Sequence, residues 1–90
     1  MKLTVQAVKH AKPAPKTRKL FDGGGLYLEV SPKGRKWWRL KYRFGGKEKK
    51  LALGVYPDVT LKEARDRRFQ AKKLLEDGID PGERRQSIRQ

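Results

Sequence analysis

The feature that most constrains the fold is residues 35–44, RKWWRLKYRF, in which apolar and cationic residues alternate. Successive side chains of an extended strand point to opposite faces. One face of such a strand carries the apolar residues Trp38, Leu40, Tyr42 and Phe44. The other face carries Trp37, Arg39, Lys41 and Arg43. The segment therefore predicts a central strand with one face on a core and one cationic face, and it assigns Trp38 and Tyr42 to the core.

The flanking segments predict two more strands beside this one. Leu26, Leu28 and Val30 alternate with Tyr27 and Glu29, which is typical of a half-buried strand. Gly45 and Gly46 fit a two-residue hairpin turn. The strand that follows places Leu51 and Leu53 on the core side and Lys50 on the cationic side. Tyr27 and Glu29, on the strand that precedes the central one, share this cationic face. We expect residues 20–21 to form only a short edge piece.

A helix is predicted from Thr60, which with Glu63 fits a capping box, to about Asp77, with Gly78 as the terminating residue. Its apolar stripe contains Leu61, Ala64, Ala71 and Leu75, with Leu74 at the edge. Arg68 falls near this stripe and is expected to extend its charge to water. The fold class is therefore α+β, a three-stranded antiparallel sheet packed against one C-terminal helix, with a short N-terminal helix or turn.

Ninety residues correspond to one domain. We divide the chain into a short helix with a basic proline-containing arm (1–19), a folded domain (20–80) and the start of a linker (81–90). The arm is interpreted either as a flexible linker or as a segment laid along a phosphate backbone. No apolar run is long enough to span a membrane, and the cations at the N-terminus lack the apolar stretch of a signal peptide.

Charge provides the main functional signal. The formal net charge is +14, and the excess cations lie in residues 1–20 and 33–50, whereas the helical segment is nearly balanced. A segregated basic surface predicts a polyanionic partner. The alternative is a solvated basic surface with no specific partner.

Catalytic and metal-binding chemistry is not predicted. The chain has one histidine, His10, and no cysteine, and its carboxylates are scattered along the sequence. The glycines at 23–25 are not followed by the Gly-Lys-Ser/Thr of a phosphate loop. We therefore expect a non-catalytic chain with no cofactor and no metal.

Binding chemistry is abundant on the cationic face. A small sheet fits the major groove of B-DNA, where Arg39 and Arg43 suit bidentate contact with guanine. Lys41 would contact base or phosphate, and Trp37 a sugar or a thymine methyl group. Lys47, Lys49 and Lys50 cluster at the hairpin and the following strand and are predicted to contact phosphates. The remaining candidate residue for binding is Tyr27, on the neighbouring strand. Double-stranded RNA is the alternative nucleic acid, and an acidic protein partner is a third possibility.

Several segments together resemble a known family: DGGGLYL (22–28), KWWRLKYRF (36–44), LALGVYPDVTLKEAR (51–65) and LLEDGIDP (74–81). In this order and spacing they are similar to the N-terminal arm-type DNA-binding domain of phage and genomic-island integrases of the tyrosine recombinase family. Two positions depart from the family pattern: the family usually has a less aromatic residue where this chain has Trp37, and more often a small residue where this chain has Arg68.

The resemblance implies that the sheet enters the major groove at arm-type sites, which serve DNA integration and excision. It implies DNA-facing positions at Arg39, Lys41, Arg43 and Lys50. It further implies a parent recombinase that assembles as an oligomer on DNA in the cytoplasm of a bacterial host, associated with the nucleoid. The separated domain is expected to be a monomer that lacks the core-binding and catalytic domains.

Overall fold

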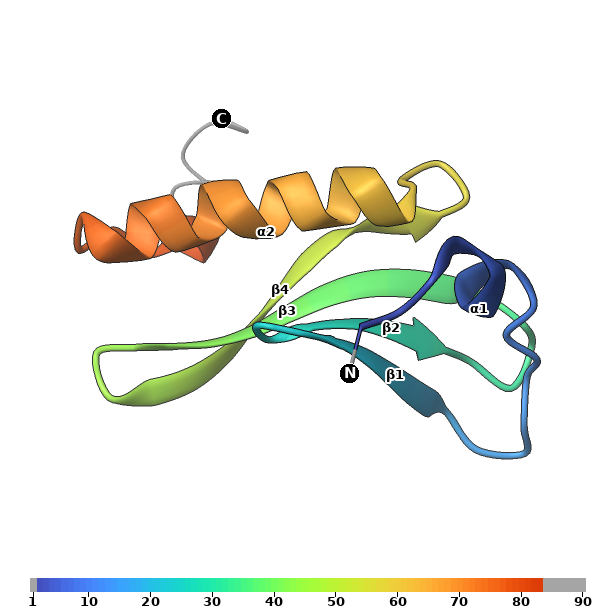
Figure 1. Ribbon diagram of the computed structural model, residues 1–90. Coiled ribbons are helices and arrows are strands. Elements are labelled where there is room, and N and C mark those ends of the chain that lie inside the picture. The colour runs from blue at the N-terminus through green and yellow to red at the C-terminus, as the bar shows by residue number, and fades with distance from the viewer. Residues whose placement is uncertain (1, 84–90) are drawn as a thin grey trace.

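The computed structural model describes residues 2–83 (Figure 1). The elements in chain order are α1 (Val5–Lys9), β1 (Arg18–Gly23), β2 (Leu26–Val30), β3 (Lys36–Phe44), β4 (Lys47–Tyr56) and α2 (Leu61–Glu76). The strands form one antiparallel sheet in the order β1-β2-β3-β4. The predicted α+β class is confirmed, but the predicted number of three strands is wrong, because the sheet has four.

The additional strand is β1, which pairs with β2 from Arg18 opposite Val30 to Gly23 opposite Leu26. The full length of this strand is not recognisable from the sequence, because its inward residues are not a regular apolar series. Leu20 is only half-buried, and the fully buried residue of β1 is Asp22, a carboxylate. As a result, the end of the predicted basic arm belongs to the sheet, and Lys19 lies in a strand.

Helix α2 begins and ends as predicted. The Thr60 hydroxyl accepts a hydrogen bond from the Glu63 backbone N–H, and the Glu63 carboxylate accepts one from the Thr60 backbone N–H, which completes the capping box. At the other end Gly78 adopts a φ of 75°. The Ile79 N–H donates to the Leu74 carbonyl and the Gly78 N–H to the Leu75 carbonyl, which is the Schellman pattern.

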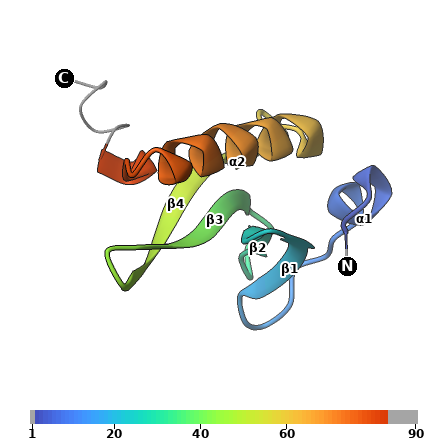
Figure 2. The same cartoon turned by 60° about the vertical axis from the view of Figure 1, so that its left-hand side comes forward.

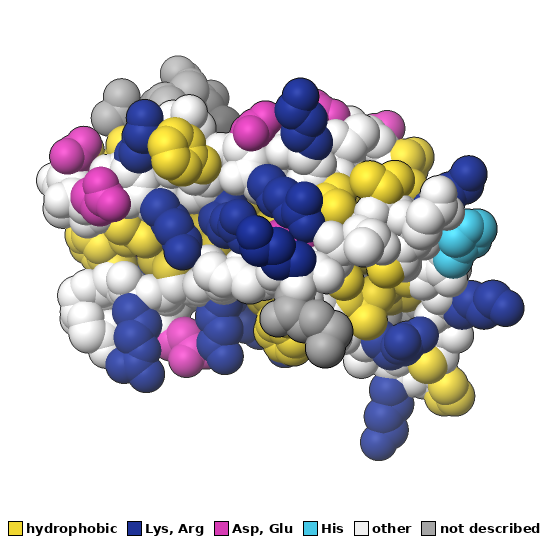
Figure 3. Space-filling model, in the orientation of Figure 1, with side chains coloured by type: hydrophobic (Ala, Val, Ile, Leu, Met, Phe, Trp, Pro, Cys, Tyr) yellow, Lys and Arg dark blue, Asp and Glu magenta, His cyan; other side chains and the backbone are white. Residues whose placement is uncertain are grey.

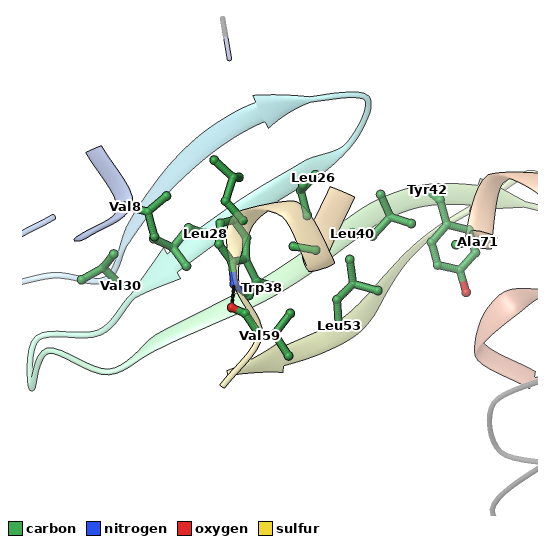
Figure 4. Packing of buried hydrophobic residues seen from close by; sticks show 12 residues of the cluster. Val8, Leu26, Leu28, Val30, Trp38, Leu40, Tyr42, Leu53, Val59 and Ala71 are labelled. Carbon is green, nitrogen blue, oxygen red and sulfur yellow. Dashed lines mark hydrogen bonds between the residues drawn. The ribbon is translucent and has the colours of Figure 1, made fainter. Parts of the chain in front are cut away.

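The core lies between α2 and one face of the sheet, and no element of residues 2–83 covers the other face (Figure 2). Trp38 is fully buried at its centre, and its indole N–H donates a 2.7 Å hydrogen bond to the Val59 carbonyl (Figure 4). Leu40 and Tyr42 continue the buried series along β3. The alternation in the central strand is thus confirmed on its apolar side.

Strand β4 contains a bulge opposite the middle of β3. Trp38 pairs with Gly54 and Arg39 pairs with Ala52, so Leu53 is the extra residue. The Leu53 carbonyl accepts a 2.6 Å hydrogen bond from the Arg67 guanidinium of α2, so this backbone group is satisfied. A side chain at Gly54, where φ is 138°, would run into Val59, so the bulge brings β4 close to the segment entering α2.

The N-terminal segment packs beside the sheet, with Val8 buried in the same core. Thr4 caps α1, since its hydroxyl accepts from the Ala7 N–H at 3.0 Å. The Lys36 ammonium closes the other end of α1 by donating to the carbonyls of Val8 and Lys9 at 2.9 and 3.1 Å. The short predicted N-terminal helix is therefore present and is fixed to β3.

Candidate nucleic-acid interface

The register of the strands places one set of side chains on the face of the sheet opposite α2, which we call the outer face. These residues come from all four strands: Lys19 and Phe21 (β1), Tyr27 and Glu29 (β2), Trp37, Arg39, Lys41 and Arg43 (β3), and Glu48, Lys50, Ala52 and Val55 (β4). Figure 3, which views the molecule as Figure 1 does, shows Lys and Arg side chains projecting below the sheet. The predicted row Trp37, Arg39, Lys41 and Arg43 is thus brought together on one surface.

Arg39 lies at the centre of the outer face, directly opposite Tyr27. Its Nε atom is 3.4 Å from the Glu29 carboxylate, and the two side chains are 32% and 19% exposed. Tyr27 lies on the predicted face but is only 1% exposed, with Phe21 against its ring at 5.4 Å and the Lys19 ammonium 5.6 Å from the ring centroid. The prediction therefore gave the face of Tyr27 correctly, but the ring is covered by its neighbours.

The environment of Tyr27 also suppresses its ionisation. Burial, followed by the nearby negative charge of Glu29, raises the pKa of the Tyr27 hydroxyl, against the opposing effect of Arg39 and Lys41. The hydroxyl stays a neutral group that can donate or accept a hydrogen bond. Among the residues that the structure describes, the buried side-chain polar atoms without a hydrogen-bond partner are the Tyr27 hydroxyl and Arg39 Nε.

The β3–β4 hairpin carries a second cationic group. The Lys41 ammonium pairs with the Glu48 carboxylate at 3.0 Å, and both side chains are about half exposed. The hydrogen bond from Lys41 lowers the pKa of Glu48. Lys50 lies opposite Lys41, and Arg43 opposite Glu48, and both cations are exposed. One acid therefore stands among three cations at this end of the outer face.

The opposite end of the outer face is more apolar. Trp37 lies across from Val55, which is 43% exposed. Trp37 borders a hollow that is also lined by Gly34, Arg35, Lys36, Val55, Tyr56 and Pro57. The outer face thus changes from a cationic hairpin end to an aromatic and aliphatic end.

Lys47 and Lys49, predicted with Lys50 to contact phosphates, lie on the opposite side of the sheet from Lys50. Both alternate with Lys50 along β4 and so belong to the side of the sheet that faces α2. The Lys49 ammonium is 2.5 Å from the carboxylate of Asp80, which is 3% exposed, while Lys47 is an exposed residue at the hairpin turn. Of the three lysines predicted to contact phosphates, only Lys50 belongs to the outer face.

Asp80 binds three groups on the helix side. Its carboxylate accepts hydrogen bonds from Lys49, from the Tyr42 hydroxyl at 2.6 Å and from the Gly82 N–H at 2.9 Å. Burial opposes the charge of Asp80, but these hydrogen bonds outweigh it and lower its pKa to about 2. Burial and the bond to Asp80 raise the pKa of Tyr42 to about 12. Lys49 therefore has a structural partner that sequence reasoning did not identify.

A second buried carboxylate, Asp22, joins the N-terminal segment to α2. It accepts hydrogen bonds from Arg65 at 2.8 and 3.0 Å and from the Leu3 N–H at 2.7 Å. Arg68 also contacts Asp22 at 3.3 Å and donates to the Gly23 carbonyl at 2.8 Å. The prediction that Arg68 extends to water is therefore wrong, because this buried carboxylate draws it inward. The hydrogen bond from Arg65 is the main cause of the lowered pKa of Asp22.

Within residues 2–83, no group of three or more histidine, cysteine or acidic residues is arranged to hold a metal ion. None of the helices described is both long and apolar enough to cross a bilayer.

Comparison with known proteins gives a consistent result. A profile described as an arm DNA-binding domain matches residues 3–88. The chain is 60% identical over 83 residues to the integrase of Enterobacteria phage P4, which covers 90% of this chain and 19% of that protein. It is 51% identical over 79 residues to the integrase of Shigella phage Sf6 and to the prophage integrase IntS of Escherichia coli K12, in each case 88% of this chain and 20% of the relative. The chain thus spans about a fifth of the length of these relatives.

Proposed function

Because this chain belongs to the arm DNA-binding domain family, we propose that it binds double-stranded DNA through the outer face of its sheet, inserted into the major groove. The bound domain would position an integrase at arm-type sites that flank the place of strand exchange. The resemblance found in the sequence and the integrase names of the relatives support this assignment.

The observation that carries the proposal is the excess of cations on the outer face. Five cations and two acids lie on it, and the cations are Lys19, Arg39, Lys41, Arg43 and Lys50. No other part of the described chain covers this face, so a ligand can approach all four strands. The major groove of B-DNA is about 12 Å wide and admits a two-stranded ribbon such as the β3–β4 hairpin.

Within this proposal the residues divide into two roles. Arg39 and Arg43 carry planar guanidinium groups that match the acceptor pair of guanine. Lys41 and Lys50 are point charges suited to phosphate, and phosphate contacts fix the position of a protein on the duplex without reading its sequence. Trp37 and Val55 offer apolar contact at the other end of the face.

Strand cleavage and joining are proposed to belong to the rest of a longer integrase, since the chain spans about a fifth of its relatives. On DNA that integrase would act as an oligomer in the bacterial host. One domain that contacts DNA weakly would then gain strength from its linked copies.

The proposal is tested by titrating the chain with duplex DNA, duplex RNA of the same sequence and an acidic peptide at one salt concentration. We expect duplex DNA to bind most tightly. Replacing Arg39 by Ala should weaken DNA binding by about 1–3 kcal/mol. The matched control is Lys62→Ala, which removes an exposed cation from α2 on the other side of the molecule.

Tighter binding to RNA or to the peptide would contradict the proposed function. Loss of binding in Lys62→Ala with retention in Arg39→Ala would show that the outer face is the wrong surface.

A further inference from the structure

We infer that Glu29 is a positioning residue that holds the Arg39 guanidinium for guanine, and so sets sequence preference at the centre of the outer face. This inference rests on the proposed DNA-binding function. It assigns to an acidic residue, which by charge alone opposes DNA binding, a specific contribution to recognition.

The geometry around Arg39 supports this role. Glu29 Oε2 lies 3.4 Å from Arg39 Nε, on the side of the guanidinium nearest the side-chain stem. Among the described residues Glu29 is the ion-pair partner of this guanidinium and no acceptor hydrogen-bonds it, so its two terminal nitrogens remain for a ligand. Those nitrogens form a planar fork that matches the O6 and N7 acceptors of guanine in the major groove. The negative charge of Glu29 lies beside Nε in ion-pair rather than hydrogen-bond contact, and it favours the orientations of the fork that keep Nε near the carboxylate.

A second observation comes from unpaired polar groups at the same place. Arg39 Nε and the Tyr27 hydroxyl are both buried without a hydrogen-bond partner, and the two residues are direct partners across β2 and β3. Buried polar atoms are usually paired, because an unpaired one keeps the cost of leaving water without gaining a hydrogen bond. Two residues that pair across neighbouring strands thus each carry a buried polar atom without a partner on this face, and a polar ligand could supply those partners.

Glu48 shows what the alternative role of an outer-face acid would be. It pairs with Lys41 in an exposed position, with 47% of the Glu48 side chain accessible. Lysine presents a flexible point charge rather than a fixed fork, so Glu48 has no geometry to impose on it. By contrast, the Glu29 side chain is only 19% exposed and lies among Lys19, Trp37 and Arg39. The chain therefore provides its own matched control for the removal of one outer-face negative charge.

The test begins with a random pool of duplexes, from which the 90-residue chain enriches a preferred sequence. A scrambled duplex of the same composition serves as the reference. Binding is measured for the wild-type chain, Glu29→Gln and Glu48→Gln on both duplexes. It is also measured on versions of the preferred duplex in which single guanines are replaced by 7-deazaguanine, which lacks the N7 acceptor.

For the wild-type chain we expect one 7-deazaguanine substitution to weaken binding roughly tenfold, as for loss of a bidentate base contact. Glu29→Gln should lose this penalty, because the Arg39 guanidinium is no longer held in one orientation. The ratio of its affinity for the preferred duplex to its affinity for the scrambled duplex should be roughly tenfold smaller than that of the wild type. Its binding to the scrambled duplex should be equal to or tighter than wild type, since a negative charge has been removed. Glu48→Gln should tighten binding to both duplexes and keep the wild-type ratio.

The inference is overturned if Glu29→Gln keeps both the 7-deazaguanine penalty and the wild-type ratio. It is also overturned if both glutamine variants lower the ratio equally, since that result would be a general charge effect. If Glu29→Gln fails to fold, its midpoint of thermal unfolding will be lowered. Glu29→Asp, which keeps the charge but shortens the side chain, is then measured in place of Glu29→Gln, and it should also lose the 7-deazaguanine penalty. If the wild-type chain binds no duplex at all, the proposed function itself fails, and that outcome is distinct from a lost preference.

Discussion

The Tyr42 hydroxyl donates a 2.6 Å hydrogen bond to Asp80 Oδ1, so the central strand is tied to a residue four positions beyond the end of α2. Both groups are buried, and the Asp80 carboxylate also holds Lys49 from the neighbouring strand. The helix side of the hairpin and the chain that leaves α2 are thus joined through one carboxylate. This carboxylate has direct consequences for stability.

Replacing Tyr42 by Phe should lower the free energy of unfolding by about 1–3 kcal/mol, because it removes a donor to a buried, charged acceptor. The measurement is urea unfolding followed by tryptophan fluorescence. Tyr56→Phe is the matched control, since the Tyr56 hydroxyl has no hydrogen bond to any residue of the described range 2–83. It should change the unfolding free energy by less than about 0.5 kcal/mol. Equal effects of the two substitutions would show that the bond to Asp80 contributes nothing.

Acid should destabilise the fold through Asp80. Its pKa is lowered to about 2 in the folded chain from an ordinary value of 3.8, so the stability that its charge contributes is present above pH 4. That contribution is lost as the pH falls from about 4 towards 2. Thermal unfolding across this range should give a shallower pH dependence for Asp80→Asn than for the wild type. Part of the acid sensitivity should remain in the variant, because the pKa of Asp22 is also lowered.

Lys49 and Lys50 are neighbours in sequence but should behave as opposites. Lys49→Ala removes a partner of buried Asp80 and should lower the midpoint of thermal unfolding. Lys50→Ala should leave that midpoint unchanged, weaken all duplexes alike and reduce the slope of log affinity against log salt by about one. Should Lys49→Ala change only the salt slope, the division between the two faces of β4 would be incorrect.

Asp22→Asn should loosen the N-terminal segment. Arg65 donates to Asp22 and to the Leu3 carbonyl at 2.7 Å, and the Leu3 N–H donates to Asp22. Loss of the carboxylate charge weakens each charge-assisted bond, so the free energy of unfolding should fall by about 1–3 kcal/mol. Hydrogen exchange of the Leu3 amide should accelerate, whereas in the control Asp58→Asn, at an exposed turn, it should not. Unchanged Leu3 exchange in Asp22→Asn would contradict this account.

The local features of the fold were predictable from sequence because each depends on residues close together in the chain. The alternation of β3 placed Trp38, Leu40 and Tyr42 in the core, and the capping box gave the start of α2. The glycine at position 78 marked the end of that helix. Strand periodicity and helix capping involve spacings of two to four residues, so the sequence alone shows them.

The features that sequence reasoning missed depend on residues far apart in the chain. Asp22 meets Arg65 across 43 positions, and Tyr42 meets Asp80 across 38. An acid followed by glycine, as at 22–23, is most simply interpreted as a turn. Neither the burial of Asp22 nor the extension of the short edge piece at 20–21 into the full strand β1 was therefore expected. The alternation of side chains along β3 correctly predicted that Arg39, Lys41 and Arg43 share the outer face. The burial of Tyr27 could not be predicted in this way, because its ring is covered by Phe21 and Lys19 of β1.

The bulge at Leu53 also determines the shape of the outer face. A bulge increases the right-handed twist of a strand pair, so the end of the face near Trp37 is rotated relative to the hairpin end near Arg43. Such a surface is twisted, so within the proposed function it fits a flat anionic layer less well than a helical groove. A helical groove turns as the sheet turns and can meet both halves. Within the proposed function, the one inserted residue thus favours a curved partner, as the cations favour an anionic one.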